Sequence, residues 1–245
     1  MARPKPSSPA EEASNTTPEP PGTLHVTLTR LKPGKVLHRV HQSMYQADQF
    51  NPGMQGNARF SPIHDEQGTP IPTLYAGTTM ACALMETVFH DIPHTAGFKS
   101  VDKGKLAGQV HSTIQVEEEL QLVDLASVPL RKLGVTRKQL IDTEKNQYPA
   151  TRKWAAAIHS QFPQAQGLSW VSRQDDSARA MILFGDRITS DSLQHEGAHV
   201  VCWTMRTFTM KCWTWRIGSV SILCRGKLEW NASGLMRVAT PGSTC

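Results

Sequence analysis

Residues 73 to 91 combine a strand pattern, a break and a helical pattern. Residues 74 to 76 favour a strand, Gly77 interrupts it, and either of the two threonines that follow can cap a helix. Apolar residues then recur at helical spacing, at Ala81, Leu84, Met85 and Val88. Glu86 lies on the helix face away from this stripe. A carboxylate placed there is ordinarily a solvated surface group, so its importance depends on the rest of the chain.

The remaining periodic segments predict further strands and helices. Apolar runs and alternating patterns predict strands over residues 24–28, 36–40, 106–116, 120–125, 167–172 and 180–184. Apolar residues at helical spacing predict helices over residues 136–144 and 150–162. Strands and helices do not alternate strictly, as they would in βαβ units. The predicted class is therefore α+β.

Composition sets limits on the ends of the chain and on its location. Residues 1 to 22 hold six of the sixteen prolines and few apolar residues, which predicts a disordered leader. No run of 18 apolar residues exists and no apolar stretch follows the N-terminus, so we expect a cytoplasmic protein without a membrane partner. The five cysteines form neither a disulfide framework nor a CxxC metal pattern.

The positive charge is concentrated in the last part of the chain. The net charge is +5, and the segment from Ser192 onward accounts for +4 of it, with six Lys or Arg and two acidic residues. The other 191 residues are almost balanced. A general basic surface for DNA or RNA is therefore not supported, and we expect no direct binding to nucleic acid.

Three polar residues outside the central stretch are candidates for a site. Arg39 lies within the strand predicted for residues 36–40, although a mid-strand arginine is usually a surface residue. Arg59 lies in a loop rich in Gly, Pro and Asn, and such a loop can bring N–H groups and a guanidinium against a phosphate. Ser172 ends a strand without a GxSxG elbow. Neither GxGxxG nor GxxxxGK[ST] occurs, which excludes a Rossmann fingerprint and a P-loop.

Four short blocks follow one another in a fixed order. They are Leu37-His-Arg-Val40, Gly56-Asn-Ala-Arg-Phe-Ser-Pro62, Leu74-Tyr-Ala-Gly77 with Ala83-Leu-Met-Glu86, and Gly167-Leu-Ser-Trp-Val-Ser172 with Ile182-Leu-Phe184. Their order resembles the RES-domain family, the toxins of bacterial toxin–antitoxin pairs named for an arginine, a glutamate and a serine. The likeness covers about residues 36 to 190 and includes the eleven-residue spacing from Tyr75 to Glu86.

The resemblance implies a fold, an activity and a partner. The fold would be ADP-ribosyltransferase-like, a mixed split sheet with flanking helices and a cleft for NAD. Family members consume NAD by cleaving its nicotinamide–ribose bond, as a glycohydrolase, a phosphorylase or an ADP-ribosyltransferase. NAD would then be the substrate, and no separate cofactor is expected. A cognate antitoxin, typically with a helix-turn-helix DNA-binding part, would insert a segment into the cleft.

The resemblance also assigns roles to five residues. Glu86 and Arg59 would be catalytic, and the NAD-binding residues would be Arg39, Tyr75 and Ser172. These side chains suit the substrate, because a pyrophosphate favours guanidinium forks and a nicotinamide or ribose favours an aromatic wall. An oxocarbenium-like transition state favours a nearby carboxylate. No metal site is predicted.

The segment from residue 191 to 245 does not fit this pattern. It holds four of the five cysteines and four of the six tryptophans, without a sustained apolar period. Codons exist for Lys211 to Leu223 that, read two bases later, encode a helix end, a glycine break and a strand resembling the expected family terminus. We therefore predict a leader over residues 1–22, a catalytic domain over residues 23–190, and then an atypical, poorly packed tail that a frameshift would explain.

Two alternatives remain open at this point. The first is a zinc protease, because His195-Glu-Gly-Ala-His199 matches the HExxH pattern. Zinc needs those two histidines one turn apart on a stable helix, and Gly197 weakens such a helix. The second alternative is a non-catalytic RES-like remnant, inactivated by an aberrant C-terminus. Turnover of NAD separates an enzyme from such a remnant.

Overall fold

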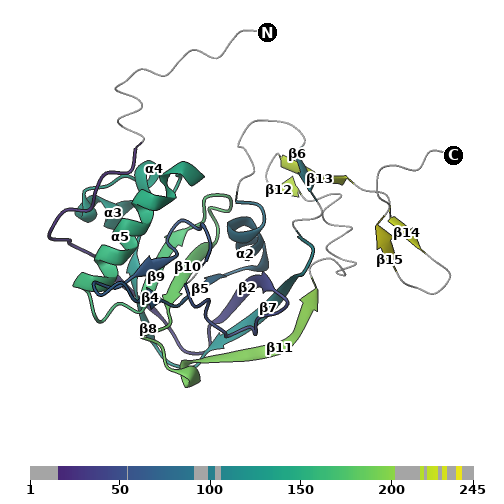
Figure 1. The fold of residues 1–245 in the computed structure, drawn as a ribbon, viewed down its shortest axis with the longest axis horizontal. Helices are drawn as coiled ribbons and strands as arrows, with labels where there is room; N and C mark the ends of the chain where they lie inside the picture. Colours follow the sequence, from purple (N-terminus) through teal and green to yellow (C-terminus); the bar gives the residue numbers. More distant parts are fainter. Residues whose placement is uncertain are drawn as a thin grey trace, which may run out of the picture.

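The computed structural model describes residues 16–53, 55–90, 99–102 and 106–201, together with the short segments 216–217, 220–225, 228–230 and 236–238. The body is built on a curled, mixed sheet of eight strands in the order β1-β8-β9-β10-β5-β2-β7-β11 (Figure 1). These strands are β1 (Leu28–Leu31), β2 (Val36–Gln42), β5 (Thr73–Gly77), β7 (Gln109–Val116), β8 (Leu120–Asp124), β9 (Gly167–Val171), β10 (Arg179–Phe184) and β11 (Leu193–Val201).

The sheet is antiparallel except where β8 pairs with β9 in parallel. Strands β2 and β5 share only one residue pair, His38 with Gly77, and they diverge beyond it. This mixed α+β architecture, with a curled sheet and a few flanking helices, confirms the predicted class and is compatible with an ADP-ribosyltransferase-like fold. The divergence of β2 from β5 opens the sheet at its centre.

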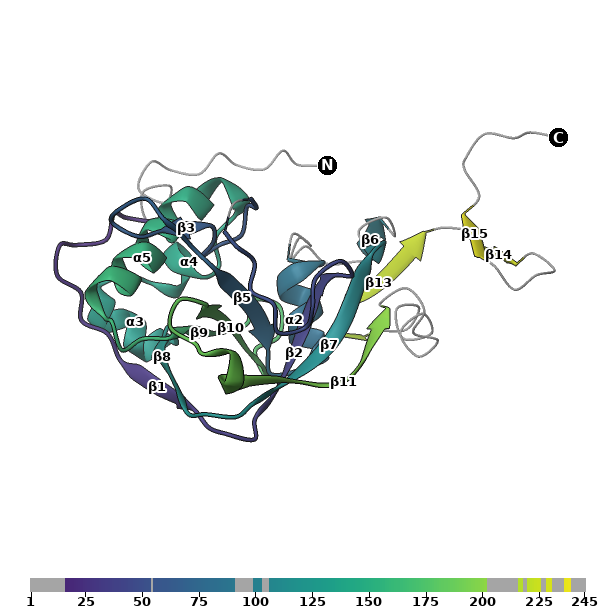
Figure 2. The ribbon, with the colours of Figure 1, turned by 60° about the horizontal axis from the view of Figure 1, so that its bottom comes forward.

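The helices pack on one face of the sheet, as Figure 2 shows from a second side. They are α2 (Met80–Thr87), α3 (Ser127–Leu133), α4 (Arg137–Leu140) and α5 (Tyr148–Gln161). The core beneath them includes the fully buried Trp154 of α5 and Trp170 of β9. A second apolar cluster fills the opposite face, with Leu37, Ile114 and Leu183 among its members. The sheet is thus buried on both faces, and its polar residues stand out as exceptions.

The strand–turn–helix predicted around Gly77 is confirmed as β5 followed by α2. The hydroxyl of Thr79 accepts a hydrogen bond of 3.0 Å from the N–H of Cys82 and caps the helix. A Cβ at Gly77 would lie 2.9 Å from the N atom of Ala83 and from the sulfur of Cys82, so only glycine fits this close approach. The tight turn fixes where Glu86 emerges from α2, almost two turns further on.

Several predicted elements differ in extent. The strand predicted over residues 24–28 is β1, which begins only at Leu28. The helix predicted over residues 136–144 is only α4, although Thr136 and Gln139 form the capping box that marks its start. Helix α3 is not among the predicted elements. Its Pro129 stands in the first turn, where the missing N–H group leaves no helix bond unmade.

Part of the predicted disordered leader is ordered. Thr17 is only 6% exposed, and its hydroxyl donates a 2.6 Å hydrogen bond to the carbonyl of Gln139. The indole N–H of Trp154 donates a 2.7 Å hydrogen bond to the carbonyl of Pro18. A buried indole needs an acceptor, and this segment supplies one. The prediction of a disordered leader is therefore corrected for residues 16–22. Residues 1–15 lie outside the described part of the chain.

The predicted domain boundary at residue 190 is also corrected. Strand β11 pairs with β7 and completes the main sheet, so the domain continues beyond that boundary. The HExxH pattern lies on this strand instead of on a helix, so His195 and His199 are not one helical turn apart. Within the described residues, no group of three or more His, Cys, Asp or Glu could hold a metal ion.

Two short 3-10 helices, Lys145–Gln147 and Ser190–Ser192, and several short strands remain. The strands are β3 (Ile63–His64), β4 (Pro70–Ile71), β6 (Lys99–Asp102), β12 (Arg216–Ile217), β13 (Val220–Arg225), β14 (Leu228–Trp230) and β15 (Met236–Val238). Strand β13 pairs with β6 in parallel, and β14 pairs with β15. The prediction that the tail is poorly packed does not hold for Ser192 and Leu193, which are buried, and from residue 198 on it falls on side chains outside the described part. None of the described helices is long and apolar enough to cross a membrane.

Candidate active site

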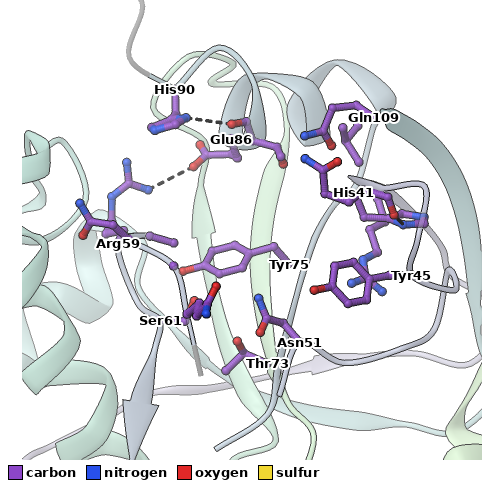
Figure 3. A pocket seen from close by; sticks show the side chains of 18 of the residues that line it. His41, Tyr45, Asn51, Arg59, Ser61, Thr73, Tyr75, Glu86, His90 and Gln109 are labelled. Carbon is purple, nitrogen blue, oxygen red and sulfur yellow. Dashed lines mark hydrogen bonds and ion pairs between the residues drawn. The ribbon is translucent and has the colours of Figure 1, made fainter. Parts of the chain in front are cut away.

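A cavity of about 330 Å³ lies where β2 and β5 diverge, beside α2. Its lining includes four of the five predicted site residues, namely Arg39, Arg59, Tyr75 and Glu86. Figure 3 shows Arg59, Tyr75 and Glu86 around the same space, with the guanidinium of Arg59 turned toward Glu86. The fold therefore brings together residues that lie up to 47 positions apart, from Arg39 to Glu86.

The carboxylate of Glu86 is held from three directions. Its Oε2 lies 3.1 Å from Nη1 of Arg59. Its Oε1 accepts a 2.7 Å hydrogen bond from the hydroxyl of Ser172 and a 3.1 Å hydrogen bond from the backbone N–H of Arg173. The side chain is only 8% exposed, so Glu86 is not the solvated surface group that its helix position alone would favour. A carboxylate oxygen has more than one lone-pair site, and acceptor capacity remains toward the cavity.

Arg59 is fixed on its other sides as well. Its guanidinium carbon lies 5.9 Å from the centre of the Tyr148 ring, within the range of a cation–π contact. Its backbone carbonyl accepts a hydrogen bond from the hydroxyl of Thr151. Its side chain is 4% exposed, and its Nε has no hydrogen-bond partner among the described residues. The loop around Arg59 is thus anchored to α5, and one guanidinium N–H remains available for another acceptor.

Tyr75 connects the same loop to the sheet. Its phenolic oxygen accepts a 2.9 Å hydrogen bond from the backbone N–H of Phe60, whose ring packs edge-on against Trp170. Burial raises the pKa of Tyr75 to about 12. The phenol is therefore neutral at physiological pH and acts as a wall and a hydrogen-bonding group, not as a base.

Arg39 lies in the same lining but has a different set of contacts. Its Nη1 donates to the backbone carbonyls of Ala47 at 2.5 Å, Gln49 at 2.7 Å and Gln46 at 3.3 Å. Burial lowers the pKa of Arg39 to about 10, so the side chain keeps its charge at neutral pH. Arg39 thereby holds the loop that follows β2 as one wall of the cavity. Its predicted contact with NAD stays a prediction.

Ser172 does not line the cavity. It is fully buried, and its hydroxyl donates a hydrogen bond to Glu86 from outside the cavity lining. Its backbone carbonyl and that of Val171 accept hydrogen bonds of 3.0 Å from the guanidinium of Arg137 in α4. The geometry therefore gives Ser172 the role of a positioning residue for Glu86, whereas the motif assigned it to the substrate.

Replacing Ser172 tests this role. We expect Ser172→Ala to lower kcat for a reaction at Glu86 about ten- to a hundredfold, the value of a hydrogen bond to a charged group. KM should change little, because the hydroxyl does not face the cavity. The matched control is Ser177→Ala in the same β9–β10 loop, where an exposed hydroxyl donates to Asp175. A large rise in KM for Ser172→Ala alone would contradict the positioning role.

The comparisons with known proteins agree with the residue pattern. A scan against protein families matches the RES domain over residues 36–203. A search of curated proteins finds no match to the chain. The matched segment begins with β2 and ends just after β11, and it includes all five residues of the site. Because the match covers more than half of the 245 residues, the chain belongs to the RES-domain family.

Proposed function

We propose that this protein is an NAD-consuming enzyme that cleaves the nicotinamide–ribose bond in the cavity beside Glu86. RES-domain proteins are generally associated with NAD and with toxin–antitoxin systems. The observation that supports the proposal best is the carboxylate of Glu86, which lines the cavity while three protein groups hold it in place. Such a fixed negative charge suits a reaction in which positive charge develops on a sugar.

The proposed chemistry follows from this geometry. As the bond to the nicotinamide nitrogen breaks, its electron pair goes to the ring, and positive charge develops on the ribose. The carboxylate of Glu86 stabilises that charge. Because its three contacts already hold it in place, the carboxylate does not need to reorganise during the reaction. The ring of Tyr75 forms an adjacent wall for the flat nicotinamide or the ribose.

The size of the cavity limits what it encloses. Ligand pockets measure roughly 300 to 1,000 Å³, and this cavity of about 330 Å³ is at the lower end. It therefore suits the nicotinamide riboside half of NAD, and the second half would extend beyond the mouth. Water, phosphate or a protein side chain would complete the reaction at the sugar carbon. A cognate antitoxin that fills the same cavity is the proposed partner.

The proposal is tested by incubating the purified full chain with NAD, with and without phosphate, and separating the products by chromatography. We expect free nicotinamide in at least one buffer. Released ADP-ribose would identify water as the acceptor, and a phosphorylated ADP-ribose would identify phosphate. NADH is the matched control, because its uncharged dihydronicotinamide is a poor leaving group and should stay attached. If a folded sample leaves NAD intact in both buffers, the chain is the non-catalytic remnant.

A further inference from the structure

The cavity offers less positive charge than a dinucleotide requires. The pyrophosphate of NAD carries two negative charges, which favour guanidinium partners. The lining holds two arginines and one glutamate, a formal net charge of +1 with neutral histidines. Arg59 faces Glu86 at 3.1 Å, and the charge of Arg39 is opposed by the nearby Asp48. A dianion at the mouth therefore needs a cation from outside the lining.

Arg152 of α5 is not part of the lining but forms an exposed hydrogen bond to it. Its Nη1 donates a 2.9 Å hydrogen bond to Oδ1 of Asn57, which lines the cavity. It lies one helical turn after Tyr148, another lining residue. Its only hydrogen bond within the described residues is to this neutral amide, and it forms no ion pair there. Its charge is therefore free to meet an anion.

The loop over residues 55–58 adds hydrogen-bond donors beside Arg152. Gly56 has φ +130°, and a Cβ built there would meet no atom within 4 Å, so the loop presents its backbone to open space. Within the part of the chain that the structure describes, the N–H groups of Gly56 and Asn57 have no hydrogen-bond partner. Neighbouring backbone N–H groups and a guanidinium are the donors that phosphate oxygens prefer.

We propose that Arg152 and the loop 55–58 form a phosphate-binding subsite at the mouth of the cavity, which takes the pyrophosphate of NAD. This subsite rests on the proposed function, because it places the pyrophosphate outside a cavity that encloses nicotinamide riboside. Asn57 holds the guanidinium beside the loop before substrate arrives. Arg152 is then a substrate-binding residue that the motif pattern does not include.

The test compares Arg152→Gln, Arg152→Lys and Lys153→Gln in the full chain. Lys153 is the matched control, since it is the next residue of α5 and is ion-paired with Glu19 at the surface. KM and kcat for NAD are measured together with the Kd of ADP-ribose by calorimetry. Arg152→Gln should raise KM and Kd about tenfold, the value of one charge-assisted hydrogen bond. Arg152→Lys should recover part of this loss, and Lys153→Gln should match the parent.

The outcomes separate the subsite from the proposed function. Inhibition by free nicotinamide should be equal in all variants, because nicotinamide carries no phosphate. If the parent cleaves NAD and Arg152→Gln behaves like Lys153→Gln, the subsite is wrong and the proposed function stands. If the parent neither cleaves NAD nor binds ADP-ribose, both are wrong. A fall in thermal stability in Arg152→Gln, with KM restored at lower temperature, would make Arg152 a structural residue and contradict the subsite.

Discussion

Glu86→Gln should lower the rate of NAD cleavage by ~10² to 10³, equivalent to ~2.7 to 4 kcal/mol of transition-state stabilisation. Glutamine keeps the size of the side chain and the acceptor for Ser172 and Arg173, but it removes the negative charge. Single-turnover rates with saturating NAD measure the effect on the chemical step. Glu117→Gln is the control, because the side chain of this exposed glutamate accepts a hydrogen bond from Gln115 at the surface and from no other residue that the structure describes.

The same substitution should also lower stability measurably. The sequence pattern alone places Glu86 on the helix face away from the core stripe, where a glutamine would change the melting temperature little. In the structure the carboxylate faces the buried guanidinium of Arg59. A glutamine would either turn its amide N–H group toward this guanidinium or lose the hydrogen bonds from Ser172 and Arg173. A buried donor left without an acceptor costs ~1 to 3 kcal/mol. Parental turnover in a folded Glu86→Gln protein would contradict the catalytic assignment.

Arg59→Met should destabilise the fold by about 3 to 5 kcal/mol, the usual cost of removing one partner of a buried ion pair. The side chains of Arg59 and Glu86 are 4% and 8% exposed, so the remaining carboxylate cannot be hydrated fully. Urea unfolding of the variant and the parent measures the difference. Arg30→Met is the control, because its pair with Glu119 is exposed and should contribute about 0 to 1 kcal/mol.

The double variant Arg59→Met/Glu86→Leu separates stability from catalysis. Removing both charges leaves no unpaired buried charge, so the double variant should be more stable than Arg59→Met alone, even though the Ser172 hydroxyl and the Arg173 N–H lose Glu86 as their acceptor. It should nevertheless be inactive, because the carboxylate is gone. If Arg59→Met unfolds at the same urea concentration as the parent, the ion pair does not contribute to the fold as its burial indicates.

Periodicity predicted the elements whose positions burial determines. The helix expected over residues 150–162 is α5, and the strand expected over residues 180–184 is β10, each within two residues at its ends. Helix α5 turns one apolar face, which repeats in the sequence, into the core, and β10 is a continuous apolar run because both of its faces are buried. Residues 16–22 have no such repeat. They are ordered because Trp154 and Gln139 provide partners more than a hundred residues away, which no local pattern contains.

The sequence predicted which residues form the candidate site but not the contacts between them. The order of motifs identified Arg59 and Glu86, and the structure joins them across 27 residues. The direction of the Ser172 hydroxyl depends on how β9 packs beside α2, and the sequence has no period that reports it. Tyr148, which faces Arg59, begins α5 two residues before the helix predicted over residues 150–162, so the pattern does not distinguish it from a surface tyrosine.

Proton NMR of NAD mixed with the full chain measures the proposed reaction most directly, because it follows the nicotinamide–ribose bond itself. With the parent protein, we expect the anomeric proton signal of the nicotinamide ribose to disappear while the signals of free nicotinamide grow at an equal rate. With Glu86→Gln at the same concentration, both changes should be ~10² to 10³ slower. An intact NAD spectrum in the presence of the folded parent, or equal rates for the two proteins, would contradict cleavage at Glu86.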